Sequence, residues 1–267
     1  MVAKLTETVS FSYRLQFVGG GATVGRIFVA CVAAVMAFQH APAAVAQEKG
    51  AVRAGFSAES LKGQKILLFR PSVWVGEQST GGLAEPNGDQ TAQSRVFLAN
   101  ELQRRQADFN NEVMAEPELV GLDATVLSSH RALFGSVAQA VVTYQFFKGN
   151  RLPTRKNKAF DWTLGDGTKR ISELTGARYG FFIYTHDEYG SFGRKAFQIL
   201  AAGLVGVGVQ SGVHKGYAGL VDLQTGELVW LNADEQMGGD VRNEEGMRKR
   251  VGQLLEDFPG LKAVLKP

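Results

Sequence analysis

One short segment gathers several groups that could do chemistry: Thr185-His186-Asp187-Glu188-Tyr189. An imidazole, two carboxylates and two hydroxyls can bind a metal, exchange protons or hydrogen-bond a ligand. The segment follows an aromatic-rich run that predicts a strand, and successive strand residues point to opposite faces. His186 and Asp187 therefore cannot address one metal ion without a turn, and we predict no metal site here.

Four further residues could extend this segment into a ligand groove. Asp161 and Trp162 occur in a turn-rich stretch, and Arg194 and Lys195 follow Tyr189 closely along the chain. Trp and Tyr are equally common as core residues, so the groove is one of two interpretations. The alternative function for this chain is therefore a hydrolase or ligand-binding protein that uses residues 185–195 with Asp161.

Two other motifs do not predict catalysis or nucleotide binding. Ser128-Ser129-His130 places a hydroxyl beside an imidazole, but adjacent residues do not form a nucleophile–base pair, and the chain has no Gly-x-Ser-x-Gly elbow. Residues 206–212 match a dinucleotide glycine pattern, yet no helix is predicted after them to receive a pyrophosphate. We predict no catalytic residues, no nucleotide site and no cofactor.

The N-terminal region predicts export. Arg26 precedes an apolar run over residues 27–38, and Ala44-Val45-Ala46 forms a small-x-small cleavage site before Gln47. Twelve apolar residues span about 18 Å as a helix, short of a hydrocarbon core of roughly 30 Å. We therefore expect a signal peptide over residues 1–46 and a periplasmic or secreted protein. The alternative is an inner-membrane anchor through residues 24–44.

Cleavage after Ala46 would change the composition in two ways. It would remove Cys31, the only cysteine, and with it any disulfide or thiolate site. It would also remove three basic residues and one acidic residue from totals of 29 and 26, leaving 26 and 25. A chain so nearly balanced carries no basic footprint for nucleic acid, so we predict no nucleic-acid partner.

The rest of the chain alternates strand and helix signals. We expect an α/β sandwich, in which helices flank a mixed sheet of about five strands and a C-terminal helix ends the chain. Residues 47–63 should form a flexible arm, and residues 64–267 a single α/β domain. The expected strands are 65–69, 178–185, 217–223 and 227–232; the expected helices are 91–107, 128–148, 168–175 and 243–258, with a long loop over 76–90.

Two segments, Gly176–Ile183 and Gly219–Trp230, together resemble a recurring bacterial pattern. CsgG-like envelope proteins, related to the curli-secretion lipoprotein, and the N-terminal domain of the Tol translocation protein share it. In these families a Gly-Ala-Asp-Tyr strand precedes a hairpin whose turn reads Asp-x-x-Thr-Gly. Here Arg178 replaces the acidic residue, and the turn ends at Gly226, for which we predict a positive φ. The resemblance implies helices on a mixed sheet and a non-enzymatic envelope role.

Our leading hypothesis is an exported, envelope-associated protein of non-catalytic, protein-interaction or assembly type. Its partners would be an envelope protein or a second copy of the chain, with membrane contact as a further option. The predicted contact surface is Gly193–Val213, because its apolar residues exceed what one helix face needs for packing on a sheet. The alternative is that residues 193–204 form a core helix and residues 205–213 the loop that leaves it. Val205, Val207 and Val209 carry this prediction in its glycine-rich half, where we expect Gly208 to tolerate replacement better than Gly226.

Overall fold

The computed structural model describes residues 49–147, 150, 153–154, 159–196, 199 and 212–262. These residues belong to the second of two compact units, Ala46–Pro267; the first is Met1–Val45. Within the described part of the chain, no helix has both the length and the apolar character needed to cross a membrane. The predicted signal peptide and cleavage site lie outside the described residues.

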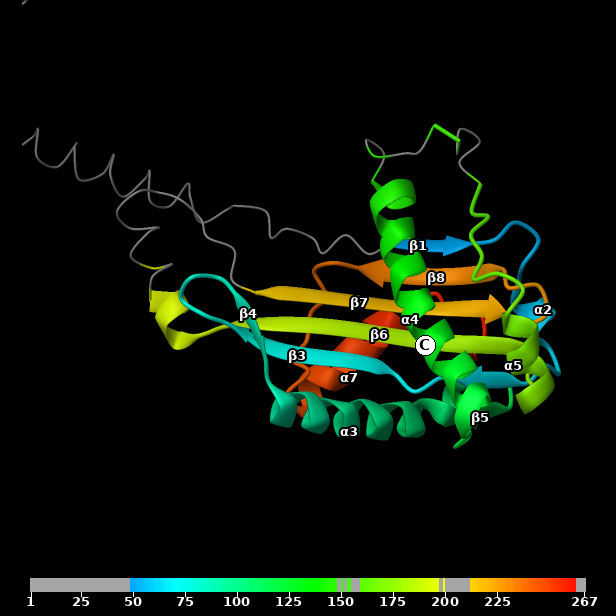
Figure 1. The fold of residues 1–267 in the computed structure, drawn as a ribbon, viewed down its shortest axis with the longest axis horizontal. Helices are drawn as coiled ribbons and strands as arrows, with labels where there is room; N and C mark the ends of the chain where they lie inside the picture. The colour runs from blue at the N-terminus through cyan, green and yellow to red at the C-terminus, as the bar shows by residue number, and fades with distance from the viewer. Residues whose placement is uncertain are drawn as a thin grey trace, which may run out of the picture. The chain divides into compact units, whose positions relative to one another are not determined.

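An eight-stranded mixed sheet forms the centre of this unit (Figure 1). The prediction of an α/β fold with a mixed sheet is confirmed, although the sheet is larger than the expected five strands. Its main path runs β1-β8-β7-β6-β2-β5, and β3 pairs with both β6 and β4. The strands are β1 (Lys49–Val52), β2 (Ile66–Leu68), β3 (Ser72–Gln78), β4 (Ala84–Pro86), β5 (Val113–Ala115), β6 (Tyr179–Gly190), β7 (Val213–Asp222) and β8 (Leu228–Asp234).

The longest strand, β6, organises the sheet. One of its edges pairs antiparallel with β7, and the other pairs parallel with β2 and then with β3. β2 and β3 thus lie one after the other along β6, separated by a break at residues 69–71. Pro71 has no N–H group to donate to a ladder, which accounts for the break between the two short strands.

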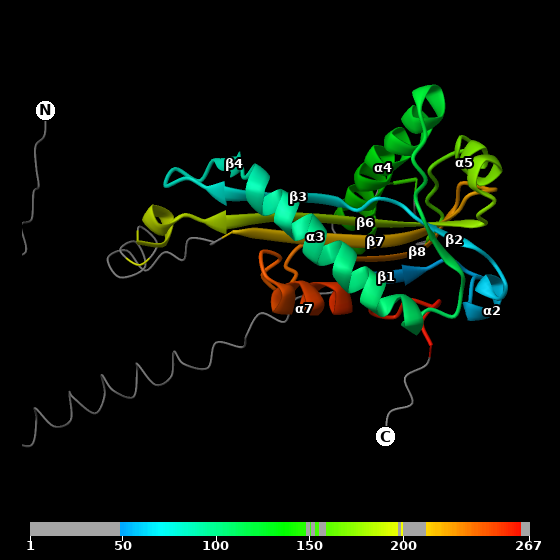
Figure 2. The ribbon, with the colours of Figure 1, turned by 90° about the horizontal axis from the view of Figure 1, so that it is seen from below.

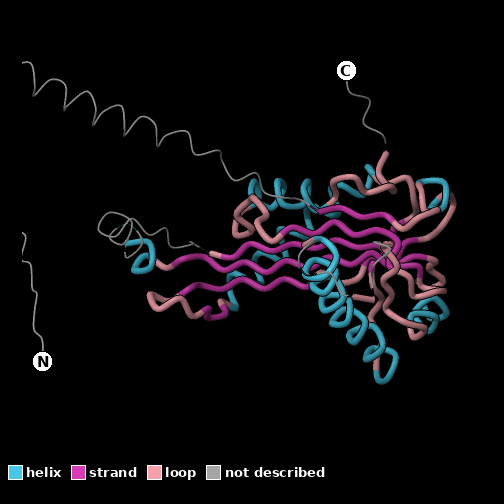
Figure 3. The backbone as a smooth tube through the Cα atoms, turned by 90° about the horizontal axis from the view of Figure 1, so that it is seen from above, coloured by secondary structure: helices cyan, strands magenta, loops and turns pink. Residues whose placement is uncertain are grey.

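Helices cover both faces of the sheet. On one face lie α3 (Gly88–Arg104) and α7 (Glu244–Leu254), and on the other lie α4 (Gly121–Val141) and α5 (Thr168–Thr175), as Figures 2 and 3 show. Alternation along β6 supplies both cores. Phe181 packs on the α3–α7 side and Phe182 on the α4–α5 side, and both are about 1% exposed.

Three helix predictions hold and one needs correction. Helices are found within or over the predicted ranges 91–107, 168–175 and 243–258, and Asn243 caps α7 by accepting a hydrogen bond from Gly246 N at 2.8 Å. The helix predicted over 128–148 instead begins at Gly121 and continues past Val141 as a π-helix to Phe146. Ser128 therefore lies inside α4, where its hydroxyl donates to Thr125 O, and it is not an N-cap.

Two segments that were predicted to be irregular contain strands of the sheet and parts of helices. The expected loop over 76–90 contains the end of β3, the strand β4 and the start of α3, which Asn87 caps. The expected flexible arm over 47–63 contains β1, antiparallel to β8, and the short helix α2 (Ala58–Leu61). Leu61 is about 1% exposed, so burial of its side chain fixes the end of this segment in the core.

The predicted hairpin is confirmed as β7 and β8. Gly226 has a φ of 74°, and its N–H donates to Asp222 O at 2.8 Å. The Asp222 carboxylate accepts bonds from Gln224 N and Thr225 N inside the turn, and it also pairs with Arg178. Arg178, which stands where the resembling families have an acidic residue, therefore connects the start of β6 to the turn.

Candidate functional site

The second half of β6, Thr185–Gly190, carries the segment that the sequence singled out. Its residues alternate between the two faces of the sheet, as predicted. Thr185, Asp187 and Tyr189 point towards α7, whereas His186 and Glu188 point to the opposite face. The segment therefore forms two separate groups of side chains rather than one site.

Asp187 and Arg250 form a buried ion pair on the α7 side. The guanidinium of Arg250 donates from Nη2 to Asp187 Oδ1 at 2.7 Å and from Nη1 to Oδ2 at 2.9 Å. Thr185 Oγ1 also donates to Asp187 at 2.6 Å, and His214 Nδ1 lies 2.9 Å from Oδ1. Both charged side chains are fully buried, and Arg250 further donates to the backbone carbonyls of residues 238 and 239.

The electrostatics of Asp187 favour a permanently charged, structural carboxylate. Burial by itself would raise the pKa of Asp187, but hydrogen bonds from His214 and Arg250 and the charge of Arg250 outweigh burial and lower it. A general acid or base needs access to substrate and a pKa near the working pH. Asp187 has neither property. Its ion pair with Arg250 instead has a structural role, because it joins α7 to the second half of β6.

A second, more exposed group extends this network. Tyr189 lies beside the His214 ring and beneath the Arg242 guanidinium, whose Cζ is 3.6 Å from the Tyr189 ring centroid. Burial and the nearby charges of Asp187 and Asp240 raise the pKa of Tyr189. The hydrogen bond from Arg242 lowers the pKa of Asp240 to about 2, so this ion pair persists at all ordinary pH values.

On the opposite face, His186 stacks on Trp74 of β3. The two ring centroids are 4.2 Å apart and the planes differ by 4°. His186 Nε2 lies 2.9 Å from Glu188 Oε1, and Gln78 Nε2 donates to the other oxygen of Glu188 at 2.7 Å. Burial would raise the pKa of Glu188, but these two hydrogen bonds lower it. In the described part of the chain, no three His, Cys, Asp or Glu side chains gather to hold a metal ion.

On the face that carries His186 and Glu188, the described helices do not cover the full length of the long strands. α4 crosses β6 and β7 near Tyr184 and Tyr217, and the strands β3, β6 and β7 continue beyond it (Figure 1). The side chains of His186 and Glu188, in the part of β6 that follows Tyr184, are 24% and 16% exposed. The stack is thus a partly exposed polar surface, with neighbouring β3 and β7 residues at its sides.

Asp161 and Trp162 lie at the other end of β6. Leu228 N donates to Trp162 O at 3.0 Å, and the Trp162 indole donates to Gln145 at 2.6 Å, so both residues adjoin the β7–β8 turn. That turn is level with Tyr179, seven residues before His186 along the strand. At about 3.3 Å per residue, the separation is roughly 23 Å. The structure does not bring Asp161 into the predicted groove with residues 185–195.

The far end of the long strands, which we call the distal tip, is formed by residues 79–83, 191–196 and 199. Ser191 N donates to Gln78 O at 3.1 Å, and the Arg194 guanidinium lies against Gly82 of the β3–β4 turn. Three large apolar side chains at this tip are largely exposed: Leu83 at 75%, Phe192 at 89% and Ile199 at 74%. Figure 2 shows the tip beyond the ends of α3 and α7.

The remaining predicted contact residues have different outcomes. Lys195 lies exposed at the distal tip, where its backbone N–H donates to Ser191 O at 3.0 Å. Val205, Val207 and Val209 lie outside the described residues, as does Gly208. Of the predicted contact surface Gly193–Val213, the structure describes residues 193–196, 199, 212 and 213, and the contact itself stays a prediction.

Sequence reasoning missed several residues that matter here. Arg250 is one of several basic residues in a polar helix, and nothing in that pattern marks it as buried. Trp74 lies outside every expected strand, although Val73-Trp74-Val75 is a run of β-branched and aromatic residues, which is a strand signal. Leu83 and Phe192 are isolated apolar residues in turn-rich segments, and only their placement at one tip makes them notable.

Comparison with known proteins gives distant structural matches only. No protein-family model matches the chain, and no curated protein sequence does. The PelC dodecamer from Paraburkholderia phytofirmans is similar at 10% identity and a TM-score of 0.36, over 81% of this chain and 99% of that chain. Lipoprotein GNA1162 from Neisseria meningitidis matches at 14% identity and a TM-score of 0.26, over 64% of this chain and 77% of that chain.

The C-terminal domain of LpoB from Salmonella enterica matches at 15% identity and a TM-score of 0.24, over 69% of this chain and 88% of that chain. All three matches are distant structural similarities. The similarity is too distant to bear on ligands or partners.

Proposed function

We propose that this chain is an exported, non-catalytic cell-envelope protein that acts through protein contact at its distal tip. The partner is a second copy or another envelope protein. The observation that carries the proposal is the exposure of Leu83, Phe192 and Ile199 at one end of the sheet. Covering two or three such side chains stabilises a contact by about 1.5–3 kcal/mol each, before the loss of side-chain and overall freedom.

The distal tip projects from the part of the sheet that the helices bury. The strands β3, β6 and β7 extend past the helices that bury their other ends (Figure 2). Ser191 and Arg194 join the two segments of the tip, so Leu83 and Phe192 are presented together. Val205, Val207 and Val209 belong to the same proposal, since they lie in the predicted contact segment Gly193–Val213, which begins one residue after Phe192.

A hydrolase that uses residues 185–195 with Asp161 has weaker support. Asp187 is committed to Arg250, and Asp161 lies at the opposite end of β6. We expect the double variant His186→Ala, Asp161→Asn to retain full function in a cell-envelope complementation assay. This variant leaves Asp187 in place, so its fold should be retained. Loss of function in the folded variant would favour the alternative, a hydrolase or ligand-binding protein.

Sedimentation velocity on the full chain tests the tip directly. We expect Leu83→Glu combined with Phe192→Glu to weaken association at least tenfold while the far-UV circular dichroism spectrum stays unchanged. The matched control is Leu122→Glu, because Leu122 is 85% exposed at the start of α4, away from the tip. Equal association of the tip variant and the wild type would exclude a second copy as the partner at the tip.

In cells, a photo-crosslinking residue at position 192 should trap a discrete protein adduct that position 122 does not. Flotation with vesicles of phosphatidylethanolamine and phosphatidylglycerol tests the alternative of membrane contact. Flotation that depends on the tip, without a protein adduct, would overturn the protein-contact proposal.

Export is tested by a separate experiment. N-terminal sequencing of the protein from the periplasmic fraction should begin at or near Gln47, whereas an intact apolar segment in the membrane fraction would indicate an anchor.

A further inference from the structure

The edge of the sheet has a notch where β2 ends and β3 begins. β5 covers only the three residues of β2, and Pro71 interrupts the edge before β3 starts. Two cavities open at this notch, and Pro71 lines both of them. One is apolar and lies on the α3 side; the other carries arginines and reaches the α4 side.

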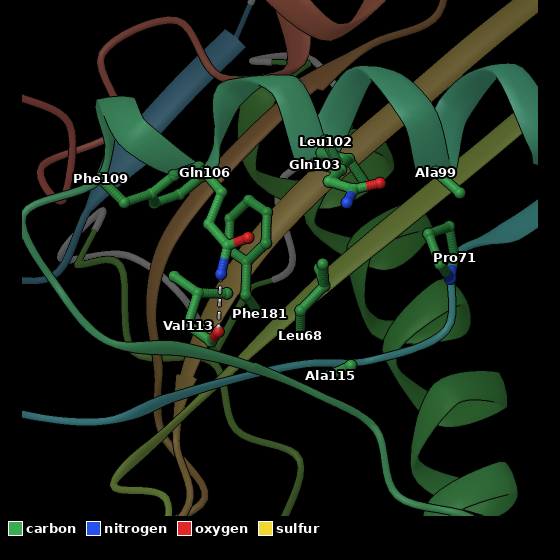
Figure 4. A pocket seen from close by; sticks show the side chains of 10 residues that line it. All are labelled: Leu68, Pro71, Ala99, Leu102, Gln103, Gln106, Phe109, Val113, Ala115 and Phe181. Carbon is green, nitrogen blue, oxygen red and sulfur yellow. Dashed lines mark hydrogen bonds between the residues drawn. The ribbon is translucent and has the colours of Figure 1, made fainter.

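The apolar cavity has a volume of about 330 Å³ and lies between α3 and the strands β2 and β5. Figure 4 shows Leu68 and Val113 on one wall and Leu102 on the other, with Phe181 between them. At one end Gln106 Nε2 donates to Val113 O at 3.4 Å. Pro71 and Ala99 lie at the other end, so the cavity is an elongated slot that extends from Gln106 to Pro71 at the notch.

The second cavity, of about 510 Å³, is cationic. Arg70, Arg95 and Arg131 line it, and no carboxylate is among its lining residues. Glu116 lies behind it and holds two of these arginines: it accepts from Arg70 N at 2.8 Å and lies 3.1 Å from Arg131 Nη1. Arg70 also pairs with the exposed Glu118.

Arg95 differs from the other two arginines. Among the described residues, no carboxylate lies within ion-pair distance of it, and its guanidinium donates only to Val73 O at 3.3 Å. Arg95 and Ala99 are four residues apart on α3 and therefore share one face of the helix. That face leads from the cationic cavity to the apolar slot, which continues with Leu102 and Gln106.

We infer that this notch binds an amphiphile with one apolar chain and one anionic head group. The chain occupies the slot between α3 and β2, and the carboxylate or phosphate lies against Arg95 and Arg131. A slot at the lower end of the usual range for ligand sites suits a single chain better than a bulky ring system. The uncompensated guanidinium of Arg95 selects an anionic head, since a charged hydrogen bond is the stronger kind.

The test is isothermal titration calorimetry on the full chain with dodecanoate below its micelle concentration. We expect Arg95→Gln to weaken dodecanoate binding about tenfold and to leave binding of neutral dodecyl maltoside unchanged. Ala99→Trp should fill the mouth of the slot and abolish binding of both. Comparison of dodecyl phosphate with dodecanoate then distinguishes a phospholipid-like source of the head group from a free fatty acid.

Two variants on the same helix serve as matched controls. Ala92→Trp and Arg104→Gln repeat the chemical changes at positions that line neither cavity, and both should bind dodecanoate as the wild type does. The inference is overturned if dodecanoate does not bind the wild type, or if Ala99→Trp and Arg95→Gln bind it unchanged. It is equally overturned if Arg95→Gln weakens the neutral ligand as much as the anionic one.

Discussion

The two faces of the distal half of β6 have opposite fates, although their residues alternate in one short segment. On one face Asp187 is fully buried and bonded to Arg250, Thr185 and His214. On the other, His186 and Glu188 remain partly exposed beside Trp74. The difference arises because α7 packs on the first face, whereas on the second face α4 crosses β6 near Tyr184 and the strand continues beyond that crossing (Figure 1).

This comparison shows why a concentration of chemically capable residues is a poor guide to a site. Asp187 accepts more hydrogen bonds than the other carboxylates of this segment, yet its burial makes it the one least able to meet a substrate. Burying it requires a partner of opposite charge, and α7 supplies Arg250. The exposed group, His186 and Glu188, makes only a ring stack and hydrogen bonds at a partly exposed surface. We therefore expect these two side chains to contribute little to stability and to tolerate substitution.

The largest expected effect is on the buried face. Arg250→Ala leaves Asp187 buried without its countercharge, which should lower the free energy of unfolding by about 3–5 kcal/mol. His186→Ala on the other face should lower it by only about 1 kcal/mol, the value of a stacked ring pair. Urea-induced unfolding followed by circular dichroism measures both. Similar losses for the two variants would break the contrast between the faces.

The double variant Asp187→Leu, Arg250→Met sharpens this result. Removing both charges takes away the uncompensated carboxylate, so the double variant should recover part of the stability lost in Arg250→Ala. Full recovery is not expected, because Thr185 and the carbonyls of residues 238 and 239 lose their partners. No recovery at all would mean that shape, rather than charge, dominates at this position.

A smaller effect separates the two ends of the sheet. Gly226→Ala combines a positive φ with a Cβ that would lie 2.2 Å from Gly165 O, so we expect a loss of about 2–4 kcal/mol. Gly82→Ala at the distal tip also has a positive φ, but its Cβ meets only the movable end of Arg194. Its loss should be about 1–2 kcal/mol. Thermal unfolding of the two variants gives the comparison, and equal losses would refute it.

The smallest expected effect is on the free energy of unfolding at acidic pH. The pKa of Asp240 is lowered to about 2 in the folded protein, below its ordinary value, so its contribution is present near neutrality and disappears as the pH falls from about 4 to 2. Asp187 acts in the same direction. Because Asp240 is partly exposed, Asp240→Asn should remove no more than about 1 kcal/mol at pH 7. The variant should lose stability less steeply below pH 4, as thermal unfolding at several pH values would show.

Much of the architecture could be predicted from local patterns. The hairpin at Asp222–Gly226, the aromatic strand before it and the helix that Asn243 caps all have signals within a few residues. The strands β1, β3, β4 and β5 were missed because they are short or surrounded by turn residues. Their pairing with β8, β6, β3 and β2 is what makes them strands, and such long-range pairing has no local signature.

The sequence by itself determined the alternation that places His186 and Asp187 on opposite faces, because a strand has a fixed period of two. It also determined the need for glycine at position 226, where a tight turn requires a positive φ. Only the tertiary structure decided which face α7 would cover, that Arg250 would meet Asp187, and that Leu83 and Phe192 would share one tip. Those outcomes depend on segments far apart in the chain, and the packing that joins them is not encoded in any one of them.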